Sequence, residues 1–171
     1  MTFEALTLAH AEPLLAFEQR NREYFERLIA PRPDDLFSSQ GMIASIAELL
    51  QETAAGLLSP WVLMDGERII ARANLHHIQH QRKTAEVGYR VDELATGQGV
   101  ATRCLQQLKI IAQQQLELTS LTAKVLDNNP ASAKVLIKQG FVFMQPMYDS
   151  VCIQGVKWRG QQYVCTLNDA S

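Results

Sequence analysis

The stretch "ATGQGVATRCL", residues 95–105, places two glycines two positions apart and then changes at once to the spacing of an amphipathic helix. The apolar residues that follow recur at intervals of three and four along one helix face: Val100, Ala101, Cys104, Leu105, Leu108, Ile111 and Ala112. The strand-like run "TAEVGYRV" (84–91) precedes the glycines, so we expect a strand, a tight turn and a long helix. The first amides of a helix have no acceptor and carry partial positive charge, which predicts an anion site; a turn without a ligand is the alternative.

Local signals also predict the elements before this turn. Two helical patterns span 10–29 and about 38–50, with a break expected around Arg20 to Arg22 in the first and a proline-containing loop at 30–39 between them. The run 61–75 has Asp65-Gly66 at its centre, a dipeptide typical of a β-hairpin. Together with 84–91, this run predicts an antiparallel meander.

After the long helix, "LTAKVL" (121–126) predicts another strand. Asn129 before Pro130 has the pattern of a helix N-cap followed by its first residue, and Gly140 stands where a helix ends, so 130–139 predicts a short helix. The runs 141–148 and 162–167 predict a closing pair of strands. This order indicates an α+β (mixed α/β) fold, with one central sheet and helices packed on it.

The composition predicts a single globular domain over residues 1–171. With 47% hydrophobic residues, a chain of this length can bury one sizeable core. A net charge of −2 provides no basic field for nucleic acid, and no leader-like start or apolar run of about 18 residues indicates a membrane, which predicts a cytoplasmic protein. The three cysteines lie far apart, so we expect neither disulfides nor a zinc site: Cys104, Cys152 and Cys165.

Two longer motifs resemble a known enzyme superfamily. "GYRVDELATGQGVATRCLQQL" (88–108) and "NNPASAKVLIKQGF" (128–141) are similar to the paired cofactor-binding motifs of the GCN5-related N-acetyltransferases, the GNAT superfamily. "FEQRNREYFE" (17–26), "AEVGYRV" (85–91) and "IQGVKWRGQQY" (153–163) extend the resemblance to the branch that contains the bacterial ribosomal-protein N-terminal serine and alanine acetyltransferases. The resemblance implies the GNAT fold, a mostly antiparallel, splayed sheet of about six or seven strands with about four helices, and acetyl-CoA as the acetyl donor.

The resemblance also implies where coenzyme A binds. Its pyrophosphate lies on the glycine turn and the first helical turn, at Gly97, Gln98, Gly99, Val100, Ala101 and Thr102. The preceding strand separates from its neighbour, and the pantetheine arm pairs with its backbone at Val87, Tyr89 and Val91. Asn129 holds the pantetheine or a bridging water, or else only caps the next helix. Ser132 is either a coenzyme contact or a first-turn helix residue.

Direct acetyl transfer requires a neutral amine, a donor for the developing oxyanion and a path for one proton. An α-amine with a pKa near 8 is about 10% neutral at pH 7, so a modest base suffices. Glu86 is the candidate base, acting directly or through water, or else an ordinary solvated carboxylate. The backbone N–H of Tyr89 or Val91 is the candidate oxyanion donor.

Two departures from the family pattern bear on the proposed site. Leu94 replaces a polar residue before the glycines, and Leu136 stands where many members carry a general-acid tyrosine. Three residues are candidates to replace that tyrosine, unless they serve only in packing: Tyr148, Ser150 and Tyr163.

Two groups of ionisable residues raise further alternatives. His76, His77 and His80 suggest a metal site, but adjacent strand residues point to opposite faces, so we predict no metal. The acidic residues around the first loop form a solvated charged surface or line an acidic mouth for a cationic acceptor: Glu23, Glu26, Asp34 and Asp35.

These features predict an acetyl-CoA-dependent N-acetyltransferase acting on a primary amine, first of all the N-terminal α-amine of a protein. One alternative acceptor is a small amine, such as a polyamine, an amino acid or an antibiotic; another alternative is a catalytically silent acyl-CoA-binding module, which Leu94 and Leu136 favour. An open groove would favour a peptide, whereas a pocket closed by 30–39 and the C-terminal hairpin would favour a small amine. The protein is expected to be a monomer or a homodimer.

Overall fold

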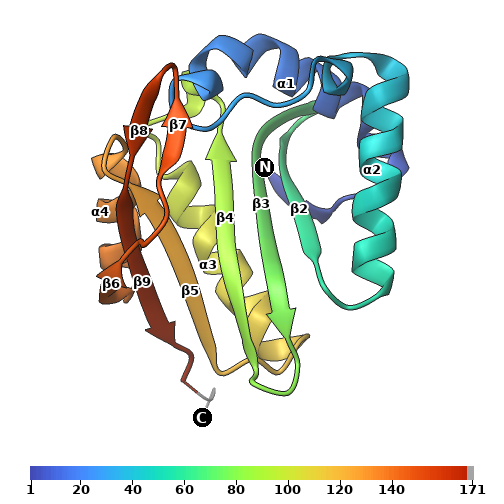
Figure 1. The fold of residues 1–171 in the computed structure, drawn as a ribbon. Coiled ribbons are helices and arrows are strands. Elements are labelled where there is room, and N and C mark those ends of the chain that lie inside the picture. Colours follow the sequence, from blue (N-terminus) through green and yellow to red (C-terminus); the bar gives the residue numbers. More distant parts are fainter. Residues whose placement is uncertain (169–171) are drawn as a thin grey trace.

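The computed structural model describes residues 1–168, and its centre is a seven-stranded sheet in the order β1-β2-β3-β4-β5-β9-β6 (Figure 1). Only the β4–β5 pair is parallel, so the expected mostly antiparallel sheet is confirmed. The strands are β1 (Thr2–Ala5), β2 (Ser59–Asp65), β3 (Arg68–Gln79), β4 (Thr84–Val91), β5 (Ser120–Leu126), β6 (Val142–Pro146) and β9 (Gly160–Thr166).

The helices are close to those expected from local signals. They are α1 (Ala11–Glu26), α2 (Ser39–Ala54), α3 (Val100–Gln114) and α4 (Pro130–Lys138), with 3-10 turns η1 (Leu8–His10), η2 (Asp34–Phe37) and η3 (Glu93–Ala95). Ser38 caps the start of α2 by accepting a hydrogen bond from the Gly41 N–H. The break expected around Arg20 to Arg22 is wrong: α1 is continuous, because Arg20 bonds the buried Asp92 and the buried Asn21 donates its Nδ2–H to the Phe17 carbonyl of the same helix.

Two hairpins differ in detail from the expectation. The hairpin at Asp65-Gly66 forms, but its central residues are Gly66 and Glu67, and of these Gly66 has the positive φ, +63°. The closing pair β6–β9 also forms, with an additional short hairpin between its strands that local patterns did not predict: β7 (Val151–Ile153) and β8 (Val156–Trp158). Three-residue strands are too short to show a period.

Strand β4 pairs with β5 over only half of its length. Thr84 to Val87 pair with Ser120 to Ala123, whereas 88–91 pair with β3 alone and 124–126 pair with β9 alone. The two parallel strands therefore separate from Gly88 onward, which confirms the splayed sheet. The chain that connects them runs through the glycine turn and α3, so the separation and the turn lie at the same end of the sheet (Figure 1).

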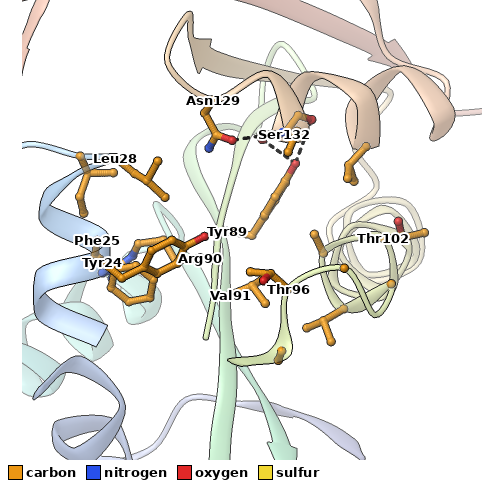
Figure 2. A pocket seen from close by; sticks show the side chains of 18 of the residues that line it. Tyr24, Phe25, Leu28, Tyr89, Arg90, Val91, Thr96, Thr102, Asn129 and Ser132 are labelled. Carbon is orange, nitrogen blue, oxygen red and sulfur yellow. Dashed lines mark hydrogen bonds between the residues drawn. The ribbon is translucent and has the colours of Figure 1, made fainter. Parts of the chain in front are cut away.

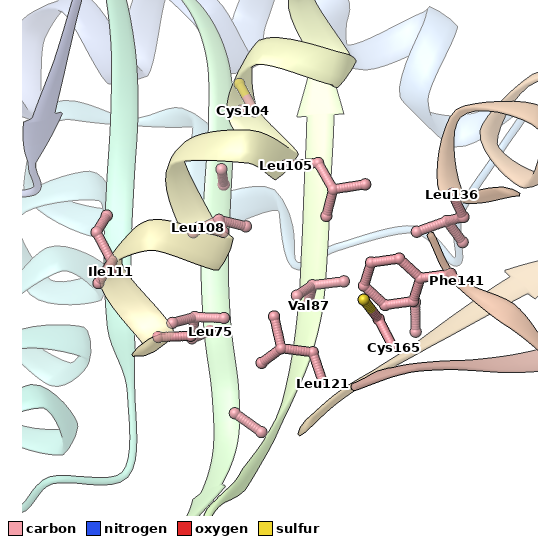
Figure 3. Packing of buried hydrophobic residues seen from close by; sticks show 14 of the residues in the cluster. Leu75, Val87, Cys104, Leu105, Leu108, Ile111, Leu121, Leu136, Phe141 and Cys165 are labelled. Carbon is pink, nitrogen blue, oxygen red and sulfur yellow. The ribbon is translucent and has the colours of Figure 1, made fainter. Parts of the chain in front are cut away.

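Two apolar clusters cover the two faces of the sheet. One contains the buried stripe of α3 together with Leu136 and Phe141, packed on alternate residues of β3, β4 and β5 (Figure 3). The other joins α1 and α2 to β2 and the start of β3 through residues such as Phe17 and Ile46. Glu86 and Arg90 of β4 lie on the opposite face of the sheet from α3, because successive strand residues point to alternate faces.

Candidate active site

The glycine turn leaves the start of α3 uncapped by any side chain. Gly97 and Gly99 have φ values of +74° and +77°, and Gly99 occupies the N-cap position. A Cβ built on either would meet no protein atom within 4 Å, so the left-handed backbone rather than crowding calls for glycine. The amides of Val100 to Thr102 have no intrahelical acceptor in such a helix start, and they border open space.

A cavity of about 420 Å³ opens in front of these amides (Figure 2). Its walls come from the C-terminal part of α1, the end of β4, the glycine turn and the first turns of α3 and α4. All the residues predicted to bind the coenzyme line it except Val87 and Gln98; the Gln98 side chain instead donates a hydrogen bond to the Leu94 carbonyl. The sequence patterns did not predict the wall supplied by Tyr24, Phe25, Leu28 and Ile29.

A second, smaller cavity of about 160 Å³ lies where β4 and β5 separate. It is lined by 87–89 of β4 and by 123–126 of β5, and therefore includes the predicted residue Val87. Both cavities share lining residues from the segment after α1, from β4 and from the start of α4: Leu28, Ile29, Tyr89, Asn129 and Ser132. The space before the glycine turn thus adjoins the gap between the strands.

Three polar side chains are fixed at the border of the two cavities. The Asn129 Oδ1 accepts a hydrogen bond from the Ser132 N–H at 3.3 Å, which makes Asn129 the N-cap of α4 as predicted and leaves its Nδ2 for another partner. The Tyr89 hydroxyl lies 2.9 Å from the Ser132 Oγ (Figure 2). Burial raises the pKa of Tyr89, so this phenol stays neutral at physiological pH.

A buried ion cluster supports the same end of β4 from the α1 face. Glu18 is fully buried and is bonded to Arg32, while Arg90 approaches its two oxygens at 3.0 and 3.2 Å and Arg72 lies at 3.7 Å. Burial lowers the pKa of the Arg90 guanidinium to about 10, so it remains charged at neutral pH. Since Arg90 also lines the larger cavity, this cluster places a fixed cation at its wall.

Glu86 belongs to a separate group farther along the sheet. Its carboxylate lies 3.4 Å from His76 Nε2 and 3.9 Å from Lys124 Nζ, and it lines neither of the two cavities. Burial acts to raise the pKa of Glu86, but His76 and the charge of Lys124 outweigh it and hold the pKa below its ordinary value. A carboxylate with a lowered pKa is a weak base, which argues against Glu86 as the direct proton acceptor.

The expectation that His76 and His77 point to opposite faces is wrong. The β3–β4 register shifts between His76 and Gln79, and His77 has a φ of +50°, so the two rings lie side by side with centroids 4.9 Å apart. Donor atoms of these histidines and Glu86 come within 4.8 Å of one another. Lys124 already supplies a positive charge to Glu86, and we assign no metal to this group.

Comparison with known proteins decides the family. The model of the acetyltransferase (GNAT) domain matches residues 1–142, most of the chain. The chain belongs to the GNAT acetyltransferases. It is therefore an N-acetyltransferase by family. The glycine turn and the splayed strands are the features that its resemblance to the GNAT motifs predicted.

Individual relatives agree with this assignment. The chain is 29% identical over 167 residues to the probable N-acetyltransferase YjcK of Bacillus subtilis, covering 95% of this chain and 91% of the relative. It shares its fold with the ribosomal-protein-S5-alanine acetyltransferase of Vibrio fischeri (TM-score 0.91, 20% identity, 99% and 94% of the two chains). It also shares its fold with RimL, a ribosomal L7/L12 α-N-protein acetyltransferase solved with coenzyme A (TM-score 0.89, 18% identity, 99% and 94%).

The structure also locates the two residues that depart from the family pattern, and the candidates to replace the missing tyrosine. Leu136 is 1% exposed and lines the smaller cavity, while Leu94 is 75% exposed. The candidates to replace the missing tyrosine line neither cavity: Tyr148 and Ser150 are exposed, and Tyr163 is buried in the sheet.

The first loop does not line either cavity of the acetyltransferase. Arg22 bonds both Glu26 and Asp34, which neutralises part of the acidic surface. No residue of 30–39 and none of the β7–β8 hairpin lines these cavities. Among the described residues, no helix is long and apolar enough to cross a membrane.

Proposed function

We propose that this GNAT enzyme transfers the acetyl group of acetyl-CoA to a primary amine, the N-terminal α-amine of a protein. The observation that carries the proposal is the pair of adjoining cavities, which leads from the uncapped amides of α3 to the gap between β4 and β5. A pyrophosphate suits the first position, because helix amides and the helix dipole favour an anion. An extended pantetheine arm suits the second, because backbone from Gly88 onward has no partner on β5.

The chain's own groups would then bind and orient the thioester. The amides from Gln98 to Thr102 receive the pyrophosphate, and the free Nδ2 of Asn129 faces the arm while its Oδ1 caps α4. The backbone N–H of Tyr89 or Val91 serves as donor to the oxyanion that forms when the amine attacks. An α-amine is partly neutral at pH 7, so it needs little activation compared with a lysine.

A protein N-terminus is favoured as acceptor by two observations. The names of two similar structures describe acetyltransferases of ribosomal proteins, and one of these names specifies an α-N-protein acetyltransferase. The segments that would close a small pocket, 30–39 and β7–β8, line neither cavity, which leaves room for an extended chain. Small amines are the competing class of acceptor.

Thermal unfolding with and without ligands tests the donor. At a hundred times its Kd, acetyl-CoA should add about 2.7 kcal/mol of stability, or about 5–10 °C for a chain of this length, and coenzyme A should act similarly. NAD and ATP are the comparison ligands. Equal shifts with all four, or none, would contradict the proposal.

A matched pair of glycine variants tests the turn itself. Gly99→Leu and Gly66→Leu both place a side chain at a positive φ with open space around it, so both should lose similar stability without ligand. Only Gly99→Leu should lose the acetyl-CoA shift. Acceptors are then compared by release of coenzyme A with peptides beginning in serine or alanine, the same peptides blocked at the N-terminus, spermidine and free amino acids. Turnover of the small amines alone would overturn the peptide assignment.

A further inference from the structure

The group formed by His76, Glu86 and Lys124 spans three adjacent strands. His76 and Glu86 are cross-strand partners on β3 and β4, and Lys124 is on β5. The Nε2 of His76 lies 3.4 Å from Glu86 Oε1, and the second oxygen of Glu86 lies 3.9 Å from Lys124 Nζ. The carboxylate is therefore held between an imidazole and an ammonium, and its side chain is only 16% exposed.

The other edge of the His76 ring borders the place where the strands separate. A Cβ built on Gly88 would lie 3.2 Å from His76 Cε1 and 3.7 Å from Nδ1, so the ring lies directly against this glycine. Gly88 is the first residue of β4 beyond the β5 pairing, and it lines the cavity between the strands. The ring therefore lies beside the cavity that Gly88 lines, although His76 is not itself a lining residue, and its Nε2 faces Glu86.

An irregular backbone fixes this orientation. The register shift after His76 and the left-handed φ of +50° at His77 are unusual for a strand, and bulges of this kind re-aim side chains near functional sites. His77 lies beside His76, with its ring tilted by 68°, and is exposed. The charged and titratable groups facing His76 are Glu86 from β4, His77 from β3 and, through Glu86, Lys124 from β5.

We propose that His76 accepts the proton of the acceptor amine through Nδ1 and that Glu86 is the positioning residue that holds its Nε2–H. This inference rests on the proposed function, because it needs the thioester in the gap beside Gly88. Glu86 supports it chemically: a carboxylate kept ionised is a poor base but a good acceptor for an imidazole N–H. Imidazole, unlike a carboxylate, titrates near the pH at which the enzyme would work.

The proton and the electrons balance in a single displacement. The amine lone pair forms the new N–C bond to the thioester carbon, and the C–S bond breaks as the thiolate of coenzyme A leaves. The amine proton moves to His76 Nδ1, and the imidazolium then returns it to the thiolate through solvent. Neither a covalent enzyme intermediate nor an additional reactant is needed.

The kinetic test compares His76 with a histidine outside the group, His80. With a peptide beginning in serine as the probe and EDTA present, His76→Gln should lower kcat about 10²–10⁴-fold and remove the loss of rate on acidification, with the Kd of acetyl-CoA unchanged. His80→Gln, the control, removes a histidine outside this group whose ring bonds the Gly56 carbonyl, and should stay within about threefold of wild type. Glu86→Gln should lower kcat less than His76→Gln does and shift the acidic limb of the pH profile. Wild-type kcat and pH profile in His76→Gln would overturn the proposal, as would a wild-type activity abolished by EDTA and restored by zinc.

A second measurement needs no acceptor. In protein labelled with ¹³C-histidine, the Cε1–H signal of His76, identified by its loss in His76→Gln, should shift when acetyl-CoA is added, and that of His77 should shift less. Stabilisation by acetyl-CoA with an unmoved His76 signal would overturn this inference and leave the proposed function intact. Absence of any stabilisation by acetyl-CoA would instead refute the proposed function, and this inference with it.

Discussion

Both faces of the central sheet carry an apolar cluster, but the α1 face also holds a buried ion cluster. Under α3 and α4, the contacts are apolar, with Leu108 and Phe141 at most 1% exposed (Figure 3). Under α1, the fully buried Glu18 is surrounded by Arg32, Arg72 and Arg90. An apolar face loses stability in proportion to the contacts removed, whereas a buried ion cluster depends on every partner, because the loss of one leaves the others charged and unpaired.

Of the variants proposed, Glu18→Ala should lower the stability of the protein most, because it disrupts the buried ion cluster. It leaves three buried guanidiniums without their shared carboxylate, and buried nitrogens of Arg32 and Arg72 already have no hydrogen-bond partner. We expect a loss of about 3–5 kcal/mol in the free energy of unfolding, measured with urea. Glu12→Ala, on the exposed surface of the same helix, is the control. A loss below about 1 kcal/mol for Glu18→Ala would show that water reaches the cluster and that its ion pairs contribute little to stability.

Leu108→Ala tests the apolar face by the same measurement. Leu108 is fully buried in the middle of α3, so truncation removes packing and leaves a cavity. The expected loss is about 2–5 kcal/mol. Ile110→Ala, on the exposed side of α3, should change stability little. Equal losses for Leu108 and Ile110 variants would contradict the assigned buried stripe.

Acid should distinguish the two faces. Burial acts to raise the pKa of Glu18, but Arg90, Arg32 and Arg72 outweigh it and hold the pKa below the ordinary 4.5. As the pH falls, the unfolded chain is protonated first, so the contribution of Glu18 is complete above pH 4.5 and is lost as the pH drops through the lower folded value. Between pH 7 and 3, the stability gap between wild type and Glu18→Ala should therefore shrink, while the gap to Leu108→Ala stays constant. A constant gap for both variants would contradict this assignment.

The same comparison explains which parts of the molecule could be predicted. The glycine turn, α3 and the cap at Asn129 depend on residues close together in sequence, so local patterns were sufficient. The spacing of Leu14, Glu18 and Phe25 places Glu18 on the buried face of α1, yet its partner Arg90 lies 72 residues away and is identified only when the sheet register is known.

The histidines show a second limit of sequence patterns. Regular alternation would place His76 and His77 on opposite faces, and a single left-handed residue brings both to one edge. The polar residues around them carry no turn signal such as glycine, so nothing in the sequence marks that bulge. The bulge lies opposite the half of β4 that pairs with β5, just before the two strands separate, and this position follows only from the assembled sheet.

Asn129 should give the smallest change in stability and separate two roles that the sequence left open. Asn129→Ala removes the acceptor for the Ser132 N–H and should cost about 1 kcal/mol. Asn129→Asp keeps an acceptor at the start of α4 and should retain that stability, but it replaces the Nδ2 donor by an anionic oxygen. If Asn129 only caps the helix, Asn129→Asp should bind acetyl-CoA as the wild type does in calorimetry; if Nδ2 also contacts the coenzyme, both variants should bind it more weakly. The cap uses only Oδ1, so the two variants separate the contribution of Oδ1 to helix stability from the contribution of Nδ2 to coenzyme binding.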